Sequence, residues 1–245
     1  AMFTRGANDL SSTGIFIGGK DVSKVEDVAS RISETFFDST RVSVFLDPAG
    51  ANTTAVAAVI AAKQHISLAA SEGMKTCDAM ILGGTGPVGQ RVSRLLANEG
   101  VRVRLVSRSL KRASTCCQSI LQKIPNAHLE ATSEDMIEAV IGSADLIISA
   151  GKSGIRMLTA TQLSQATSTK VCIDLNAIPP AGIDGVHTTD HARHDGTKHF
   201  YGALGVGGMK MKLHKVAIQQ LFQTNDQWLD AEELLVLSER LMLSE

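Results

Sequence analysis

Three glycines, Gly84, Gly86 and Gly89, stand at the spacing G-x-G-x-x-G between an apolar run and a helical pattern. In a strand–turn–helix unit the first glycine permits a tight turn, the second lets backbone approach a pyrophosphate, and the third lets the helix pack on the strand. The pyrophosphate then rests on unpaired N–H groups at the start of the helix. The spacing therefore predicts a dinucleotide-binding turn.

The next apolar run, residues 101–106, ends in Ser107 and Arg108. An NAD site keeps an acidic residue for the ribose 2′-hydroxyl there, about 20 residues after the turn, and this sequence has none at that place. Arg108, with Lys111 and Arg112, can instead pair with a 2′-phosphate, to which Ser107 can donate a hydrogen bond. These residues favour NADP over NAD. The alternative is that the cations only solvate a helix start, where they would oppose the helix dipole.

A second polar group follows the glycine-rich segment 202–208, which we expect to form a turn that opens a helix. Lys210 and His214 are four residues apart and would share one face of that helix. A lysine in the first turn opposes the helix dipole unless an anion or a polar ligand compensates for it, which favours a functional role. The alternative is a solvated lysine and a packing histidine, and spacing alone does not separate the two interpretations.

Polar loops follow several predicted strands. Asp47, Asn52 and Thr53 lie between a strand and a helix, where ligands are commonly held, although Asn52 or Thr53 could equally be a helix N-cap, which spacing alone favours. Loops 149–154 and 174–180 follow later strands, and their small residues would let a nicotinamide ring lie close to backbone. The residues expected to bind the cofactor are Gly84, Thr85, Gly86, Pro87, Val88, Gly89, Ser107, Arg108, Lys111, Ala150, Gly151, Lys152 and Asn176.

Short strand-like runs alternate with helical patterns from residue 77 onward, which indicates an α/β fold with one doubly wound parallel (Rossmann) sheet. Its strands are expected at residues 79–82, 101–106, 128–131, 146–149, 171–175 and 200–203. A second, smaller α/β domain precedes this sheet. Its expected strands and helices are strands 14–18 and 42–46 and helices 22–37 and 52–70.

Domain boundaries follow from the same patterns. Residues 71–75 are polar and contain glycine, so they are the expected hinge. Two closing helices, 208–223 and 229–243, follow the last strand, and at least one should return to the smaller domain. The expected domains are a smaller substrate domain at 1–74, completed by 207–245, and a cofactor domain at 75–206.

Composition excludes several classes of partner. The 245 residues carry a formal charge of −1, with no block of like charge suited to nucleic acid or an anionic membrane. The first ten residues lack the apolar core of a secretory signal, and the longest apolar stretch, 55–62, is far shorter than a membrane span of about 20 residues. We therefore expect a cytoplasmic protein. Apolar helices in the smaller domain favour a homo-oligomer.

Cysteines and histidines give no metal-binding pattern. Cys77, Cys116, Cys117 and Cys172 lack paired ligand spacing, and adjacent cysteines in a helix would form a strained disulfide, so buried thiols are expected. Four histidines lie in a polar, loop-like segment, but only two of them are close enough in sequence to chelate together. These four are His187, His191, His194 and His199. No metal is expected.

Taken together, these residues resemble the NADP-dependent methylene-tetrahydromethanopterin dehydrogenases of one-carbon metabolism. The resemblance extends over nearly the whole chain, from Phe3-Thr4-Arg5-Gly6 through 14–19, 47–54, 84–89 and 174–180 to 202–214. It implies that the smaller domain holds a reduced pterin, with Asp47, Asn52 and Thr53 on the substrate side, and that Lys210 and His214 lie beside the reacting carbon. Family members usually carry a further N-terminal segment, which this chain is expected to lack.

The implied reaction moves a hydride from the methylene carbon of the pterin to C4 of nicotinamide and leaves a methenyl cation. It needs no strong base, because the substrate supplies its own electronic push, and positioning of the two reactants would carry most of the rate enhancement. One alternative uses tetrahydrofolate as the carrier. A second is a truncated homologue that binds NADP as a sensor or scaffold. A third is a shikimate- or amino-acid-type dehydrogenase, which should show a clearer lysine–aspartate pair.

Overall fold

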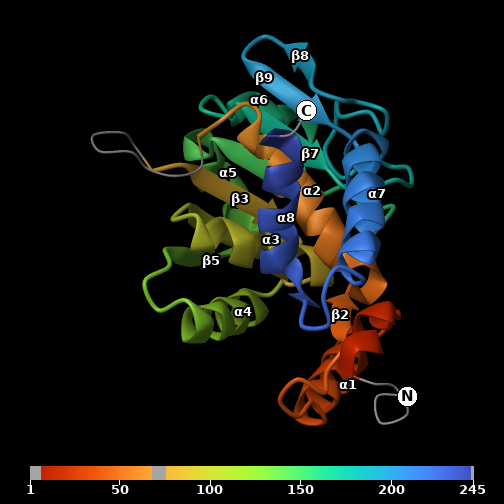
Figure 1. Ribbon diagram of the computed structural model, residues 1–245. Helices are drawn as coiled ribbons and strands as arrows, with labels where there is room; N and C mark the ends of the chain where they lie inside the picture. Colours follow the sequence, from red (N-terminus) through yellow and green to blue (C-terminus); the bar gives the residue numbers. More distant parts are fainter. Residues whose placement is uncertain (1–6, 68–75, 244–245) are drawn as a thin grey trace. The chain divides into compact units, whose positions relative to one another are not determined.

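The computed structural model describes residues 7–67 and 76–243. The chain divides into two compact units, Ala1–Val56 with Met209–Glu245 and Ala57–Gly208 (Figure 1). The two divisions fall inside helices α2 (Ala51–Lys63) and α7 (Ala203–Gln220). The predicted hinge at 71–75 lies outside the described residues, and the domain boundaries drawn from the sequence remain a prediction.

The larger unit contains a seven-stranded sheet in its described part, with the order β5-β4-β3-β6-β7-β9-β8. Every neighbouring pair is parallel except β8 and β9, which form an antiparallel hairpin at the edge. The order runs outward in both directions from β3 and β6, which confirms the predicted doubly wound sheet. The strands are β3 (Asp78–Leu82), β4 (Arg102–Ser107), β5 (Leu129–Ser133), β6 (Leu146–Ser149), β7 (Val171–Asp174), β8 (Arg193–Asp195) and β9 (Lys198–Tyr201).

The central strands have continuous apolar sequences because helices cover both faces of a parallel sheet. Every residue of β3, β6 and β7 is buried. Met80, Ile147 and Cys172 belong to one core cluster, and each is fully buried. The described helices of this unit, besides parts of α2 and α7, are α3 (Pro87–Asn98), α4 (Leu110–Lys123), α5 (Ile137–Val140) and α6 (Ala160–Gln165).

The smaller unit is built on a three-stranded parallel sheet with the order β1-β2-β10. Residues Val25 and Ala29 of α1 pack with Val44 and Leu46 of β2 in one core cluster. Strand β10 pairs with β2 although it lies far along the chain, so the C-terminal segment completes this sheet. The elements are β1 (Gly14–Ile17), α1 (Val22–Glu34), β2 (Ser43–Leu46), β10 (Trp228–Leu229) and α8 (Ala231–Leu243), with a 3-10 helix at Ala7–Ser12.

The predicted turn at 202–208 is wrong, because helix α7 begins at Ala203 and runs through these glycines. Lys210 therefore lies beyond the first turn, and the argument from the helix dipole does not apply to it. A Cβ at Gly202 would collide with the carbonyl oxygen of His187, and a Cβ at Gly205 would collide with that of Asp190. These glycines let α7 approach the 187–190 loop closely.

Four other predictions are corrected in detail. The sequence patterns missed β8 and the two-residue strand β10. The last parallel strand, β9, is Lys198–Tyr201 and begins before the predicted 200–203. Helix α2 ends at Lys63, short of residue 70, and residues 68–70 lie outside the described part. Helix α8 begins at Ala231 and not at the predicted residue 229, because residue 229 belongs to β10.

All four cysteines are free and buried, as predicted. Burial raises the pKa of the Cys116 thiol to about 11 and that of Cys172 to about 12. Thiols with such values stay protonated near neutral pH and are poor nucleophiles.

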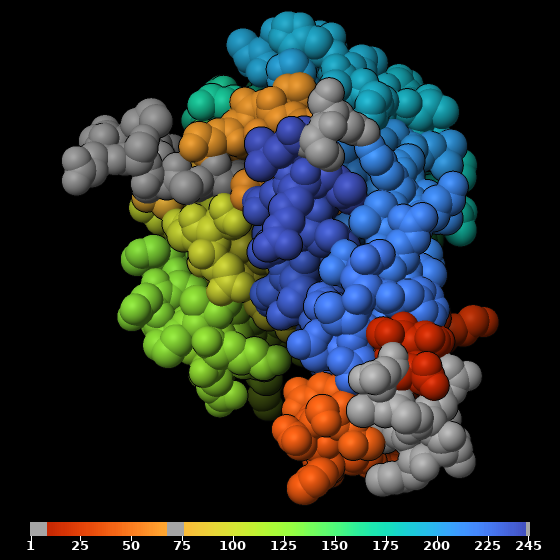
Figure 2. All heavy atoms as spheres, in the orientation of Figure 1, coloured from red at the N-terminus to blue at the C-terminus, as the bar shows by residue number. Residues whose placement is uncertain are grey.

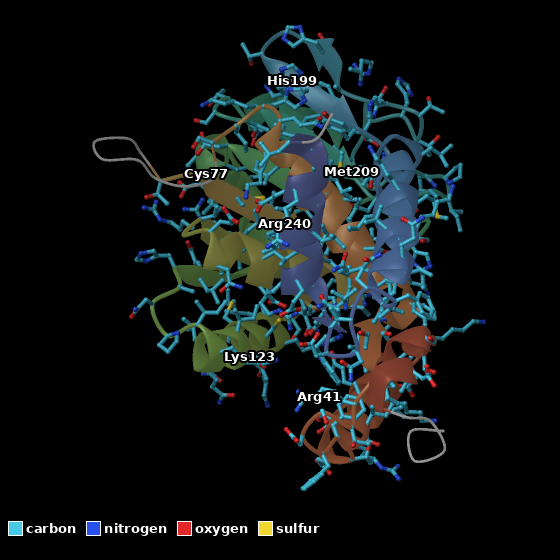
Figure 3. All side chains as sticks on the ribbon, in the orientation of Figure 1. Arg41, Cys77, Lys123, His199, Met209 and Arg240 are labelled. Carbon is cyan, nitrogen blue, oxygen red and sulfur yellow. The ribbon has the colours of Figure 1, made fainter. Side chains whose placement is uncertain are left out.

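A cluster of histidine and tyrosine side chains joins the end of α2 to the β8–β9 hairpin within the larger unit. The His65 and His199 rings stack with centroids 3.8 Å apart, and His199, labelled in Figure 3, lies 4.8 Å from the His194 ring. His65 Nε2 is 2.7 Å from the Tyr201 hydroxyl, which donates to Gln64 Oε1 at 2.9 Å. Because that proton is directed to Gln64, His65 Nε2 must carry the proton of its own bond to Tyr201.

We expect this cluster to make the stability of the protein depend on pH. Burial, and then the charges of His199 and His194, lower the pKa of His65. The unfolded chain therefore binds more protons than the folded chain as the pH falls below about 6.5, so the free energy of unfolding falls with it. His65→Gln keeps a donor for Tyr201 and cannot titrate. Melting temperatures between pH 7.5 and pH 5 should fall less in this variant.

The matched control for that measurement is His128→Gln, since His128 lies outside the cluster. It should lose as much stability as the wild type between the two pH values. An equal loss of melting temperature in His65→Gln and in the wild type would contradict the prediction.

Candidate active site

The turn after β3 lies beside β6, at the point where the sheet order reverses, which is where doubly wound folds hold ligands. Gly83 adopts φ +68°, and a Cβ there would lie 2.5 Å from Gly151 Cα. A Cβ at Gly89 would lie 2.7 Å from the Gly83 carbonyl oxygen, so α3 approaches the turn only with glycine at that position. The turn is closed by the N–H of Gly86, which donates to the Gly83 oxygen at 3.0 Å.

A cavity of about 270 Å³ opens at this turn. Seven of the residues predicted to bind the cofactor line it, and Arg112 lines it as well. The seven are Thr85, Gly86, Ser107, Arg108, Ala150, Gly151 and Lys152. Five further lining residues were not predicted from the sequence, and these are Gly83, Glu134, Ile155, Arg156 and Met157.

The other predicted cofactor residues lie outside this lining. Gly84 packs under the turn, since a Cβ there would lie 2.5 Å from Leu105 Cγ. Pro87, Val88 and Gly89 form the first turn of α3, in which the N–H groups of Val88 and Gly89 have no acceptor within the helix. Lys111 is exposed on α4, away from the cavity.

The lining of the cavity is strongly cationic. Arg108, Arg112 and Lys152 are exposed, and Arg156 pairs with Asp184 at 3.2 Å. The Ser107 hydroxyl is buried beside Thr85, with the two oxygens 3.4 Å apart. A site of this charge suits a ligand that carries several phosphate oxygens.

Asn176 organises the loop after β7 and lines a separate cavity of about 410 Å³. Its Oδ1 accepts from the N–H groups of Gly154 and Ile178 at 3.2 Å and 3.0 Å, and its Nδ2 donates to the Pro180 carbonyl at 2.8 Å. Both ends of the amide are thus engaged by backbone, so the structure supports a loop-forming role for Asn176 more directly than contact with cofactor.

Asp174 anchors the other side of the same loop. Its carboxylate accepts from the N–H groups of Asn176, Gly182 and Ile183 at 3.1 Å, 2.7 Å and 3.2 Å. Burial raises the pKa of this carboxyl, while the three N–H donors act in the opposite direction.

In the smaller unit, Asp47 rather than Asn52 or Thr53 caps helix α2. Its Oδ1 accepts from the Asn52 and Thr53 N–H groups at 3.0 Å and 3.2 Å, and its Oδ2 accepts from Thr53 Oγ1 at 2.7 Å. Asn52 Nδ2 donates to the Leu46 carbonyl and to Asp230 Oδ1. The expectation that Asn52 or Thr53 is the N-cap is wrong, because both side chains are fully buried and point to other partners.

His214 lies beside this fixed carboxylate, with its Nδ1 3.7 Å from Asp47 Oδ2. The imidazole is flanked by the rings of Phe16 and Phe45, at centroid distances of 5.6 Å and 5.3 Å. Because Nδ1 faces the carboxylate, the other ring nitrogen is the one available to a ligand. Lys210 approaches the same place, since a Cβ at Gly50 would lie 2.7 Å from its Nζ.

These side chains line a cavity of about 440 Å³ in the smaller unit. It brings together Asp47, Lys210 and His214, as the sequence suggested, but not Asn52 or Thr53. Sequence reasoning missed the other lining residues, although an aromatic residue at an outward position of a strand, as Phe16 is, was a usable signal. These are Phe16, Gly18, Gly19, Lys20, Ala49, Gly50 and Met211. An apolar wall next to an ammonium and an imidazole suits a planar ligand with polar edges.

Known proteins with similar sequences decide the family. The family model described as Methylene-tetrahydromethanopterin dehydrogenase, N-terminal, matches residues 1–49. Bifunctional protein MdtA of Methylorubrum extorquens (strain AM1) is 37% identical over 242 residues, which are 98% of this chain and 83% of that protein. The NAD(P)-dependent methylenetetrahydromethanopterin dehydrogenase of the same organism is 34% identical over 215 residues, 86% of this chain and 72% of that protein. This chain belongs to the methylene-tetrahydromethanopterin dehydrogenase family.

The family assignment confirms the resemblance drawn from the residues. Residues 63–194 of this chain also match the family model described as Shikimate / quinate 5-dehydrogenase. That match covers the glycine turn and strands β3 to β7, and it includes none of Asp47, Lys210 and His214. A transhydrogenase structure from Sinorhizobium meliloti aligns with a TM-score of 0.54 and 14% identity over 93% of this chain and 81% of that chain, which supports the fold alone.

Two further features of the described residues bear on partners. No group of three or more histidine, cysteine, aspartate or glutamate side chains is placed there to hold a metal ion. Among the helices in those residues, none combines the length and the apolar character that crossing a bilayer requires.

Proposed function

We propose that this chain is an NADP-dependent oxidoreductase that converts methylene-tetrahydromethanopterin to methenyl-tetrahydromethanopterin in one-carbon metabolism. The observation that carries the proposal is the gathering of Asp47, Lys210 and His214 around one cavity, although these residues come from opposite ends of the chain. Family membership supports the same reaction.

NADP fits the cavity at the glycine turn. A Cβ at Gly83 would lie 2.5 Å from Gly151 Cα, so glycine at this position keeps a cradle open, and a Cβ at Gly86 would lie 3.3 Å from the Gly83 oxygen. The N–H groups of Val88 and Gly89, at the start of α3, would receive the pyrophosphate. We assign the 2′-phosphate to Arg108 and Arg112, with Ser107 as a hydrogen-bond donor. NADP, when bound, supplies the hydride acceptor at nicotinamide C4.

The pterin is assigned to the cavity of the smaller unit. Lys210 would donate to a carbonyl or carboxylate oxygen of the pterin, because an ammonium facing the growing methenyl cation would repel it. His214, held by Asp47 and by two phenyl rings, would orient the pterin or the lysine. Phe16 supplies an apolar wall for a planar ring system.

The proposed hydride transfer requires no strong acid or base from the protein. The substrate would lose a hydride from its methylene carbon, for which NADP held at the glycine turn would be the acceptor. The positive charge left on the substrate would be delocalised over the two flanking nitrogens. Rate enhancement then comes from holding the carbon and C4 at about 3–3.5 Å in the reacting orientation. The carboxylate of Asp47, 3.7 Å from His214 Nδ1, can therefore serve to orient the imidazole and need not move a proton.

The test is an assay of purified protein with NADP and each methylene-carrying pterin, which follows NADPH and methenyl-pterin absorbance. We expect turnover with the tetrahydromethanopterin carrier. Faster turnover with tetrahydrofolate would favour the folate alternative. Binding of NADP without hydride transfer from either pterin would favour the sensor or scaffold alternative.

We also propose that the protein acts in the cytoplasm as a homo-oligomer. Helix α8 supports the second part, because Val236, Met242 and Leu243 are exposed apolar side chains on a helix that lies at the visible surface of Figure 2, in dark blue. Size-exclusion chromatography coupled to light scattering measures the molar mass of the protein and hence its oligomeric state.

Asp47 should prove important for both stability and turnover. Asp47→Asn loses one acceptor of the α2 cap, which costs about 1–2 kcal/mol. It also removes the negative charge beside His214 Nδ1, so we expect kcat to fall about 10-fold through poorer orientation of the imidazole. Urea unfolding and steady-state kinetics measure the two effects separately.

Thr53→Val is the matched control, since it removes the 2.7 Å hydrogen bond to Asp47 but leaves the charge beside His214. It should lower stability with little effect on kcat. Wild-type turnover in Asp47→Asn would show that the carboxylate serves the helix cap alone.

A further inference from the structure

The cavity at the glycine turn contains a carboxylate that lies far along the chain from the turn. Strands β4 and β5 pair in parallel with Ser107 opposite Ser133. The residues that follow this pair are Arg108 and Glu134, and both line the same cavity. A carboxylate thus follows the strand next to β4 and lies in this cavity, although β4 itself is followed by an arginine.

Glu134 is the one acidic side chain among the described residues that line this cavity. The other charged lining residues are basic, and these are Arg108, Arg112, Lys152 and Arg156. Arg156 already pairs with Asp184. Glu134 is half-buried, and among the described residues its carboxylate has no hydrogen bond or ion pair. A site meant only for a dianionic 2′-phosphate would gain nothing from a carboxylate at that position, because like charges repel.

We propose that Glu134 sets the choice between NADP and NAD by accepting a hydrogen bond from the ribose 2′-hydroxyl of NAD. Arg108 and Arg112 serve the 2′-phosphate of NADP from the adjacent strand end, so one cavity holds two alternative partners for the same ribose position. The carboxylate favours NAD through a charge-assisted hydrogen bond and weakens NADP through repulsion. This inference rests on the proposed binding of NADP at the glycine turn.

The test is direct binding of NADP and NAD by calorimetry, without pterin, to the wild type and to Glu134→Gln. We expect the ratio of the NAD Kd to the NADP Kd to rise about 10-fold in the variant, since a hydrogen bond to a charged group is lost for one ligand and a repulsion for the other. Glu134→Asp keeps the charge on a shorter side chain and should give an intermediate ratio. Melting curves confirm that each variant is folded.

Asp135→Asn is the matched control, because it removes the same charge one residue later, from an exposed side chain that does not line the cavity. Its ratio should equal that of the wild type. An unchanged ratio in Glu134→Gln, or an equal change in Asp135→Asn, would overturn the inference while leaving NADP binding intact. Failure of the wild type to bind either nucleotide would instead refute the proposed function, and this inference with it.

Discussion

Lys210→Ala should lower kcat with the methylene pterin about 100-fold, which is the typical cost of mispositioning a substrate by about 1 Å. The Lys210 ammonium lies over the backbone of Gly50, where it lines the cavity with Asp47 and His214. Alanine removes the only group in this set that we assign to a pterin oxygen. NADP affinity should stay near the wild-type value, since Lys210 does not line the cavity at the glycine turn. Steady-state kinetics and NADP calorimetry measure the two quantities.

His214→Ala should also depress turnover, with NADP affinity preserved. Lys215→Ala is the control for both variants, because Lys215 lies on the same helix and is exposed outside the cavity lining. It should behave as the wild type. Unchanged kinetics in both Lys210→Ala and His214→Ala would remove these residues from the active site.

Arg108→Asp should abolish the preference for NADP. The variant loses a guanidinium that can form two charge-assisted hydrogen bonds with a 2′-phosphate, and it places a like charge near that phosphate. We expect the NADP Kd to rise by about 100- to 1,000-fold, whereas the NAD Kd should change little or improve. Calorimetry with both dinucleotides measures the change.

Lys111→Asp makes the same reversal of charge three residues later, at a position outside the cavity lining. Lys111 is among the residues that the sequence pattern predicts to bind the cofactor, so this variant also tests that prediction. The structure leads us to expect a much smaller loss of NADP affinity than in Arg108→Asp. Retained NADP preference in Arg108→Asp would mean that the 2′-phosphate binds elsewhere.

Predictions of the fold succeeded where burial made the sequence pattern strong. Strands β3, β6 and β7 are buried along their whole length, and each contains an apolar run with one polar residue at an end. Strand β8 has the sequence Arg-His-Asp and lies at the exposed edge of the sheet. It therefore contains no apolar run from which a strand could be predicted. Strand β10 has only two residues, and its pairing with β2 depends on a distant part of the chain.

The start of α7 shows how one local pattern can have two physical causes. Gly202 and Gly205 read as a turn, because glycine is typical of turns. In the folded chain they lie against the carbonyl oxygens of His187 and Asp190, and the helix forms through them. Close packing against another segment and a tight turn can both require glycine, so the two cannot be told apart from the sequence.

The sequence by itself determined the glycine turn and the basic residue after the next strand, because these depend on short segments whose geometry is local. Only the tertiary structure decided that Asp47 caps α2 and lies beside His214, and that Glu134 lies in the same cavity as Arg108. These contacts depend on the register of paired strands and on the packing of helices that are far apart in the sequence. Neighbours in space are then set by packing, which no spacing along the sequence records.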